Sequence, residues 1–310
     1  MTESQNVIVP MPRAAVFLVA TVRPGREAAA RDALEGITAL ERSVGFRVPD
    51  ALLTCVVGIG SQLWDRLFTG PRPRGLHPFA ELKGPSGHHA PATPGDLLFH
   101  VRARRADLCF ELARHLREAF GDAIEVVDEV HAFKYFDDRD LLGFVDGSEN
   151  PTGGTADDAV FVGEEDAPFR GGSYVVVQKY LHDLPAWEAL GTAEQEAAIG
   201  RTKLANIEFP DDEKAPDAHI ALNSVTDEDG NELKIIRENM AFGRIGDGEF
   251  GTYFIGYART PDVIGRMLRN MFLGDRPGVH DRILDFSRAV TGNLFHVPTK
   301  DFLDDLPPSP

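Results

Sequence analysis

Strand-like and helix-like segments alternate along the first half of the chain, and this order limits the possible folds more than any other feature. Residues 14–22 form an apolar, partly β-branched run typical of a strand, and residues 26–44 carry apolar side chains near a 3.6-residue period, which predicts an amphipathic helix. A second unit repeats the order as a strand, a helix and two further strands, at 96–101, 106–120, 124–127 and 131–135. Two successive β-α-β units predict a ferredoxin-like α+β half.

The second half of the chain repeats this theme less regularly. Its expected elements are a strand at 173–180, a helix opened by Pro185, a strand at 251–258, a helix from Pro261, a final helix at 279–290 and a mobile, acidic, proline-rich tail at 301–310. Segments 219–225 and 233–239 flank turn-forming residues and predict a β-hairpin. We therefore predict two ferredoxin-like halves, an N-terminal domain of residues 1–140 and a C-terminal domain of residues 141–310.

The charge of the chain excludes several classes of partner. Lys and Arg number 32 and Asp and Glu number 49, so the formal net charge is −17. An acidic surface repels phosphate backbones and anionic lipids, so we expect neither nucleic acid nor membrane as a partner. No apolar run approaches the length of a membrane span, and the apolar segment at 14–20 is more typical of a strand than of a signal peptide. These features predict a soluble, cytoplasmic protein.

Several familiar site motifs are absent or misplaced. Segment 246–251 matches the letters of GxGxxG, but it leads into a strand, and its two carboxylates would repel a pyrophosphate, so a hairpin turn is the better interpretation. The ten His residues form no HExxH motif, and His88 and His89 lie in a Gly/Pro-rich stretch at 70–95 that we expect to be a surface loop. Nucleotide binding and zinc hydrolysis therefore have no support.

Segment 142–152 (LGFVDGSENPT) is the most informative stretch, because glycines lie on either side of an acid. Gly143 and Gly147 allow the backbone to approach a ligand closely and to direct the Asp146 carboxylate toward it. The residues alone leave a second interpretation open, in which Asp146 only bonds its own backbone in an Asx-turn.

This segment resembles the GxxDG signature of the dye-decolourising peroxidases, in a form similar to their bacterial class B subfamily. The matching residues are Gly143-Phe144-Val145-Asp146-Gly147, extended by Ser148-Glu149-Asn150-Pro151. Segments 235–240 (IIRENM) and 251–257 (GTYFIGY) resemble the family's distal-arginine segment and the strand that follows it. The resemblance covers nearly the whole chain. It implies a duplicated fold of the dimeric α+β barrel type, with haem b (iron protoporphyrin IX) in the C-terminal half.

The resemblance implies that His219 is the proximal metal ligand, which binds the haem iron through a neutral imidazole nitrogen. A ligand of this kind usually donates its other N–H to an acceptor, and Asp281 occupies the family position for that acceptor. Without the resemblance, His219 would simply begin a strand, and Asp281 would be an ordinary carboxylate at the start of a helix.

The resemblance also implies three catalytic residues on the opposite face of the haem. An ionised Asp146 can take a proton from peroxide and return it to the leaving oxygen. Arg237 is a permanent cation, which favours the ionised carboxylate and stabilises the charge that develops as the O–O bond breaks. Asn239 shares a strand face with Arg237 and can hydrogen-bond peroxide or a distal water.

Four further residues are candidates for holding the cofactor. Asn150, Arg201 and Lys203 could bind the haem propionates, although solvated surface charge is an equal alternative for the two cations. Phe254 could pack over the haem, and a place in an ordinary strand core is its alternative.

The predicted function is therefore a haem-dependent peroxidase, which reduces hydrogen peroxide through a ferryl intermediate and oxidises dyes, phenols or other small one-electron donors. The alternative is a deferrochelatase-like, haem-handling protein with little turnover, and an α+β interaction domain without cofactor is a third interpretation. Storage of haem would need His219 but not Asp146 and Arg237. The resemblance further implies a homo-oligomer. Some bacterial relatives are loaded into nanocompartments, but the tail at 301–310 contains no peptide recognisable as a signal for that.

Overall fold

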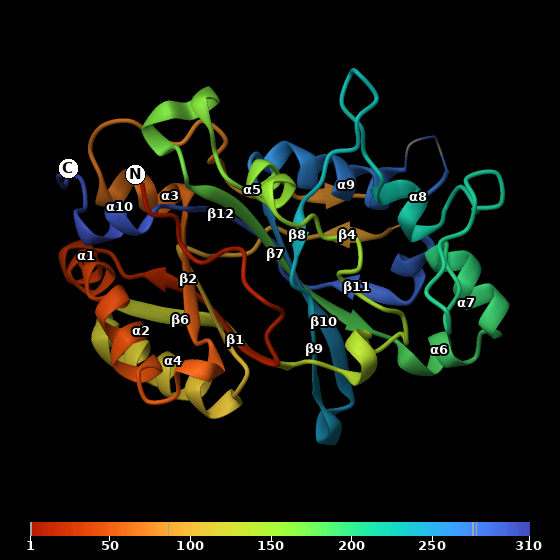
Figure 1. The fold of residues 1–310 in the computed structure, drawn as a ribbon, viewed down its shortest axis with the longest axis horizontal. Coiled ribbons are helices and arrows are strands. Elements are labelled where there is room, and N and C mark those ends of the chain that lie inside the picture. Colours follow the sequence, from red (N-terminus) through yellow and green to blue (C-terminus); the bar gives the residue numbers. More distant parts are fainter. Residues whose placement is uncertain (1, 86, 275, 277) are drawn as a thin grey trace.

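The computed structural model describes residues 2–85, 87–274, 276 and 278–310, and a large antiparallel sheet forms its centre (Figure 1). The sheet has ten strands in the order β11-β7-β12-β2-β5-β1-β6-β9-β10-β8. Strand β7 also pairs with β10, and this contact joins the series from β7 to β10 into a ring. The two halves of the chain therefore share one continuous sheet.

The first half supplies four strands of the ring and the helices that cover them. The strands are β1 (Ala14–Val22), β2 (Thr54–Gly60), β5 (Leu97–Ala103) and β6 (Ile124–Phe133). The helices are α1 (Glu27–Glu35), α2 (Ile37–Gly45), α3 (Ser61–Leu67) and α4 (Ala106–Phe120). The 70–95 segment, in which residue 86 lies outside the described part, contains a separate pair of strands, β3 (Leu82–Lys83) and β4 (His89–Ala90).

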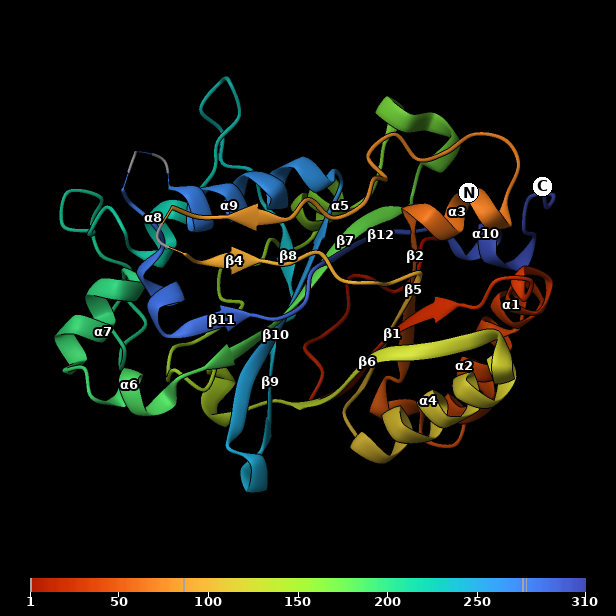
Figure 2. The same ribbon diagram turned by 180° about the vertical axis from the view of Figure 1, so that it is seen from behind.

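The second half supplies the remaining strands and a set of mostly short helices. The strands are β7 (Ser173–His182), β8 (Ile236–Arg237), β9 (Met240–Arg244), β10 (Glu249–Ala258), β11 (Ser287–Ala289) and β12 (Asn293–Val297). The helices are α5 (Gly154–Val160), α6 (Leu184–Glu188), α7 (Thr192–Ile199), α8 (His219–Asn223), α9 (Pro261–Leu273) and α10 (Lys300–Asp304). Figure 2 shows β3 and β4 beside α9 and β11. In the described part of the chain, no helix is long and apolar enough to span a bilayer.

Strand β1 shows how the core joins the two halves. Val16 and Leu18 belong to the apolar cluster under the helices, whereas the intervening Phe17 belongs to a second cluster with residues of the C-terminal half. Phe17 stacks on Tyr253 of β10, with ring centroids 4.1 Å apart. Because successive side chains of a strand point to opposite faces, one continuous apolar run serves both clusters.

The elements expected in the first half are present, with changes at two boundaries. The helix expected at 26–44 is divided into α1 and α2, because the Gly36 N–H bonds to the Ala33 carbonyl, three residues back instead of four. The strands expected at 124–127 and 131–135 are one strand, β6. The GxGxxG-like segment at 246–251 lies at the turn between β9 and β10, as predicted.

The β-hairpin expected from 219–225 and 233–239 is wrong. The residues after position 218 form the short helix α8, so His219 begins a helix instead of a strand. Of the predicted hairpin only the turn is present, and an isolated β-bridge between Thr226 and Glu232 closes it. This change matters for the site, because it places the side chains at positions 219 and 223 on one helix face.

The two expectations for the C-terminus are also wrong. Segment 279–290 is no helix, but contains a 3-10 turn at Arg282–Asp285 followed by β11. The tail at 301–310 is packed, because Leu303 and Leu306 are buried and the Thr69 N–H donates to the Pro308 carbonyl. Apolar side chains at two positions are thus enough to fix a tail that its acidic composition suggested would be mobile.

Candidate active site

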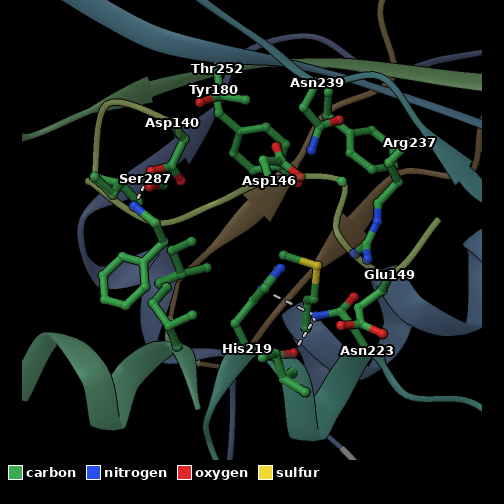
Figure 3. Close-up of a pocket in the computed structure, with 18 of the residues that line it drawn as sticks. Asp140, Asp146, Glu149, Tyr180, His219, Asn223, Arg237, Asn239, Thr252 and Ser287 are labelled. Carbon is green, nitrogen blue, oxygen red and sulfur yellow. Dashed lines mark hydrogen bonds between the residues drawn. The ribbon is translucent and has the colours of Figure 1, made fainter. Parts of the chain in front are cut away.

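A cavity of about 1110 Å³, part of it open to solvent, lies in the second half of the chain. Figure 3 shows His219 projecting into it from α8, with Asp146, Asn239 and Arg237 on the opposite side. Its apolar walls are formed by Ile199, Phe254, Met267, Leu268, Met271 and Ile283, among others. The cavity therefore combines apolar walls with polar groups on two facing sides, as ligand sites commonly do.

A buried carboxylate orients the His219 ring. The Asp281 side chain is fully buried, and its Oδ2 lies 2.7 Å from His219 Nδ1. An ionised carboxylate only accepts hydrogen bonds, so Nδ1 carries a proton, and in a neutral ring the lone pair then lies on Nε2. Asn223 Nδ2 donates to the same Asp281 oxygen at 3.3 Å and to the His219 carbonyl at 2.8 Å. The site thus holds the imidazole in one orientation, as the histidines that bind metal ions are usually held.

Asp281 also has the ordinary role that its sequence suggested. Its Oδ1 accepts a hydrogen bond from the Ile283 N–H at 3.0 Å and caps the 3-10 turn that follows. The two interpretations of this residue are therefore compatible, because each carboxylate oxygen serves one of them.

Arg237 enters the cavity from β8. Its Nε atom is buried and has no hydrogen-bond partner among the residues that the structure describes. Burial of an unpaired polar group is costly, so a guanidinium in this state favours an anionic or oxygen-rich ligand in the cavity.

Asp146 lies on the loop opposite His219, and this loop passes close to β8. Gly147 has a φ of +80°, and a Cβ atom there would lie 3.9 Å from the Arg237 carbonyl. In the described part of the chain no backbone N–H donates to the Asp146 carboxylate, so the Asx-turn is not formed. The acid is therefore available to a ligand.

Asn150 fixes this loop to β8. Its Nδ2 donates to the Arg237 carbonyl at 2.7 Å, and its Oδ1 accepts from the Arg237 N–H at 2.9 Å. The Asn150 side chain therefore bonds both the N–H and the carbonyl of Arg237. These two bonds set the distance between the Asp146 loop and the Arg237 backbone.

For the reaction with hydrogen peroxide that the sequence resemblance implies, Asn150→Ala is expected to lower the rate about ten-fold, because it loosens the placement of Arg237 relative to Asp146. Asn150→Asp keeps the acceptor for the Arg237 N–H and is expected to retain more activity. Stopped-flow mixing with peroxide measures both rates. Asn231→Ala, in the exposed turn at 226–232, is the control, and an equal loss there would contradict a specific role for Asn150.

A second carboxyl, that of Asp140, lines the cavity near Asp146. Its Oδ1 accepts from the Phe144 N–H at 2.9 Å. Burial, together with the nearby charge of Asp146, raises the pKa of Asp140 from 3.8 to about 7. A protonated Asp140 places no second negative charge beside Asp146.

Asp140→Asn is expected to flatten the pH dependence of stability. An unfolded carboxyl loses its proton near its ordinary pKa of 3.8, whereas folded Asp140 keeps it to about pH 7. The folded state thus binds more protons in this window, so its free energy of unfolding falls as the pH rises. Between about pH 5 and pH 7 the wild type should lose about 2 kcal/mol relative to the variant. Urea unfolding of the holoprotein measures this, and equal slopes would contradict a buried, protonated Asp140.

Only some of the other predicted cofactor residues line the cavity. Arg201 and Phe254 line the cavity, and the Arg201 guanidinium donates to Ser148 Oγ at 2.8 Å. Lys203 and Asn150 are not among the lining residues: the Lys203 Nζ donates to Gln195 Oε1 at 2.6 Å. Asn239 lines the cavity, and its Oδ1 accepts from the Ile255 N–H at 3.2 Å.

The polar residues of the cavity wall that were not predicted from the sequence as site residues include Asp140, Tyr180, His182 and Asn223. His182 is held by Ser287 Oγ at 2.8 Å and Thr252 Oγ1 at 2.9 Å, and burial lowers its pKa to about 4. It is therefore neutral at physiological pH. Only Asn223 had a usable signal, since it lies four residues after His219, but that spacing has meaning only on a helix.

The arrangement can perform two kinds of chemistry at once. A neutral imidazole can hold a metal ion on one side of the cavity, while a carboxylate and a guanidinium on the other can move a proton and stabilise negative charge. The apolar walls between them suit a large, flat and mainly apolar group.

Comparisons with known proteins agree with this geometry. Residues 4–134 match the family model "Dyp-type peroxidase, N-terminal", and residues 137–302 match "Dyp-type peroxidase, C-terminal". The chain is 60% identical, over 99% of its length and 87% of the relative's, to a dye-decolorizing peroxidase of Mycolicibacterium paratuberculosis. It is 59% identical to one of Mycobacterium tuberculosis, over 99% of this chain and 91% of that protein.

Solved structures give the same result. The encapsulated DyP-type peroxidase from Mycobacterium smegmatis superimposes with a TM-score of 0.98, at 60% identity and with 100% of both chains covered. DyPB from Rhodococcus jostii RHA1 has a TM-score of 0.95 at 54% identity, with 97% of both chains covered. A variant of the Rhodococcus protein has been solved in complex with heme.

Proposed function

The chain belongs to the Dyp-type peroxidase family, and from this premise we propose how its own residues serve the reaction. The protein is a haem-dependent peroxidase, which reduces hydrogen peroxide and oxidises one-electron donors such as dyes and phenols. Its cofactor is haem b. The observation that carries the proposal for the site is the pairing of His219 and Asp281 on one side of the cavity with Asp146 and Arg237 on the other.

The residues of the cavity fit haem. His219 would hold the haem iron through Nε2, because Asp281 occupies Nδ1. The apolar walls would suit a flat macrocycle, and the buried Nε of Arg237, which has no hydrogen-bond partner among the described residues, would suit an oxygen ligand. Arg201 is the candidate for a propionate, because it is the predicted propionate-binding cation that lines the cavity. When bound, haem supplies the redox centre at which the peroxide O–O bond is cleaved.

Asp146 and Arg237 divide the proton and charge chemistry between them. Asp146 takes the proton from one peroxide oxygen and delivers it to the other, which leaves as water. The Arg237 guanidinium stabilises the negative charge on the departing oxygen. Asn239, whose amide group lines the same side, donates a hydrogen bond that orients peroxide or a water.

The absorption spectrum of the purified protein, before and after one equivalent of peroxide, tests this proposal. We expect a Soret band typical of ferric haem with an axial imidazole, and a rapid change on mixing. A haem-handling protein would give the first spectrum without the second. Asp146 and Arg237 favour turnover over storage, because storage needs no acid–base group opposite the axial ligand.

We further infer that the fold is a duplication of two ferredoxin-like units, residues 1–140 and 141–310. The closed ring of strands and the similar order of elements in the two halves support this. A cytoplasmic homo-oligomer is the proposed state of the protein. The two free, buried cysteines support a reducing compartment, and exposed aromatic side chains such as Phe110 and Phe136 support contacts between copies.

A further inference from the structure

Two histidines and a carboxylate meet on the surface where the loop before β4 approaches the segment after α9. His88 Nε2 lies 3.2 Å from Asp285 Oδ1, and His280 Nε2 lies 2.9 Å from the same oxygen. The two imidazole rings have their centroids 4.4 Å apart. We propose that His88, His280 and Asp285 form a binding site for a divalent transition-metal ion of the Zn²⁺ type, separate from the haem cavity.

The distances between the donor atoms already suit an ion. One ligand atom from each side chain can be chosen so that all three lie within 4.8 Å of one another. In a tetrahedral zinc site with bonds of about 2.0–2.1 Å, neighbouring donors lie about 3.3 Å apart. The two nitrogen–oxygen distances in the cluster are close to this value, so small side-chain movements would admit the metal.

The chemistry of the three side chains selects the class of ion. Two imidazoles and one carboxylate favour Zn²⁺ and its first-row neighbours over Mg²⁺ and Ca²⁺, which prefer oxygen ligands. Three protein ligands leave one tetrahedral position for water. That position is accessible, because the side chains of His88 and His280 are 22% and 21% exposed and that of Asp285 is 45% exposed. A net charge of −17 also attracts cations to the molecule.

The ligands come from segments that are far apart in the sequence, so an ion would join them. His88 belongs to the loop before β4, whereas His280 and Asp285 lie on either side of Asp281, the partner of His219. A bound ion would therefore tie the β3–β4 strands to the segment that orients the axial histidine. Because the ion binds the folded chain, we expect Zn²⁺ to raise the thermal unfolding midpoint of the holoprotein by a few degrees.

Zinc binding to the untagged holoprotein tests the proposal. Titration calorimetry and elemental analysis after dialysis should show one equivalent of Zn²⁺ bound by the wild type. His88→Ala and His280→Ala should each weaken binding at least about ten-fold. His89→Ala is the matched control, because this neighbouring histidine pairs with Glu81 at 2.6 Å and lies outside the cluster. Its affinity should equal that of the wild type.

Substitution with Co²⁺ reports on the ligands directly. In a difference spectrum against the metal-free holoprotein, the wild type should show the visible bands of tetrahedral cobalt, and Asp285→Asn, at an exposed carboxylate, should alter them. The proposal is overturned if the wild type binds no Zn²⁺, if His88→Ala binds it equally well, or if Co²⁺ keeps its aqueous spectrum. The cluster would then be only a hydrogen-bonded His–Asp–His contact.

Discussion

Replacing Asp146 with Ala and Arg237 with Leu together is expected to slow the first reaction with hydrogen peroxide by at least about 1,000-fold, with haem content unchanged. In the proposed mechanism, Asp146 moves the proton between the peroxide oxygens, and Arg237 stabilises the negative charge on the oxygen that departs. The double variant removes both contributions but leaves His219, the proposed iron ligand, and Asp281, which bonds the His219 ring. Stopped-flow absorbance at the Soret band after mixing with peroxide measures the rate.

The control for this variant removes the same charges elsewhere. Arg244 and Asp247 form an exposed ion pair at the turn between β9 and β10, 3.0 Å apart, and neither lines the cavity. Arg244→Leu with Asp247→Ala should react at the wild-type rate. If the Asp146/Arg237 double variant also reacts at that rate, the catalytic assignment of both residues is wrong. The two single variants should be measured as well, because the effects of residues that act as a unit are not additive and the double variant alone does not give the effect of either residue.

The sequence predicted the strands better than the short helices, and the reason is physical. The apolar run of β1 is long and buried on both faces, so the sequence alone is enough to recognise it as a strand. Helix α8 has five residues, and too few turns to show a period. It is stabilised by tertiary contacts, since Asn223 bonds the His219 carbonyl and Asp281 bonds the His219 ring. The local sequence of α8 does not predict these contacts.

The candidate site was found in the sequence largely through a resemblance, and the structure shows why composition could not replace it. Asp281 and His219 are 62 positions apart, and Asn150 and Arg237 are 87 positions apart. No periodic pattern links such pairs, because only the closed sheet brings them together. Asn150 and Lys203 show that residue type alone does not place a side chain in the cavity wall. They were expected at the propionates from residue type alone, but here they bond protein groups, the Arg237 backbone and the Gln195 side chain.

His219→Ala should abolish the normal Soret spectrum and the axial-nitrogen signature in the electron paramagnetic resonance of the ferric protein. The substitution removes the only imidazole among the described residues whose ring is both oriented by Asp281 and directed into the cavity. It also leaves a fully buried carboxylate with one fewer hydrogen-bond donor, so some loss of stability is expected as well. The circular dichroism spectrum separates the two effects, because the loss of the ligand should exceed any loss of secondary structure.

Added imidazole distinguishes a ligand from a structural residue. Truncation to Ala leaves space for a free imidazole, which Asp281 can orient as it orients the His219 ring, so millimolar imidazole should restore much of the spectrum and of the reaction with peroxide. His131→Ala, at an exposed histidine of β6, is the control and should need no rescue. An unchanged axial-nitrogen signature in His219→Ala would assign the iron to another residue. Asp281→Asn should lie between the wild type and His219→Ala, because it keeps the shape of the acceptor but removes the charge that makes the imidazole a stronger donor to iron.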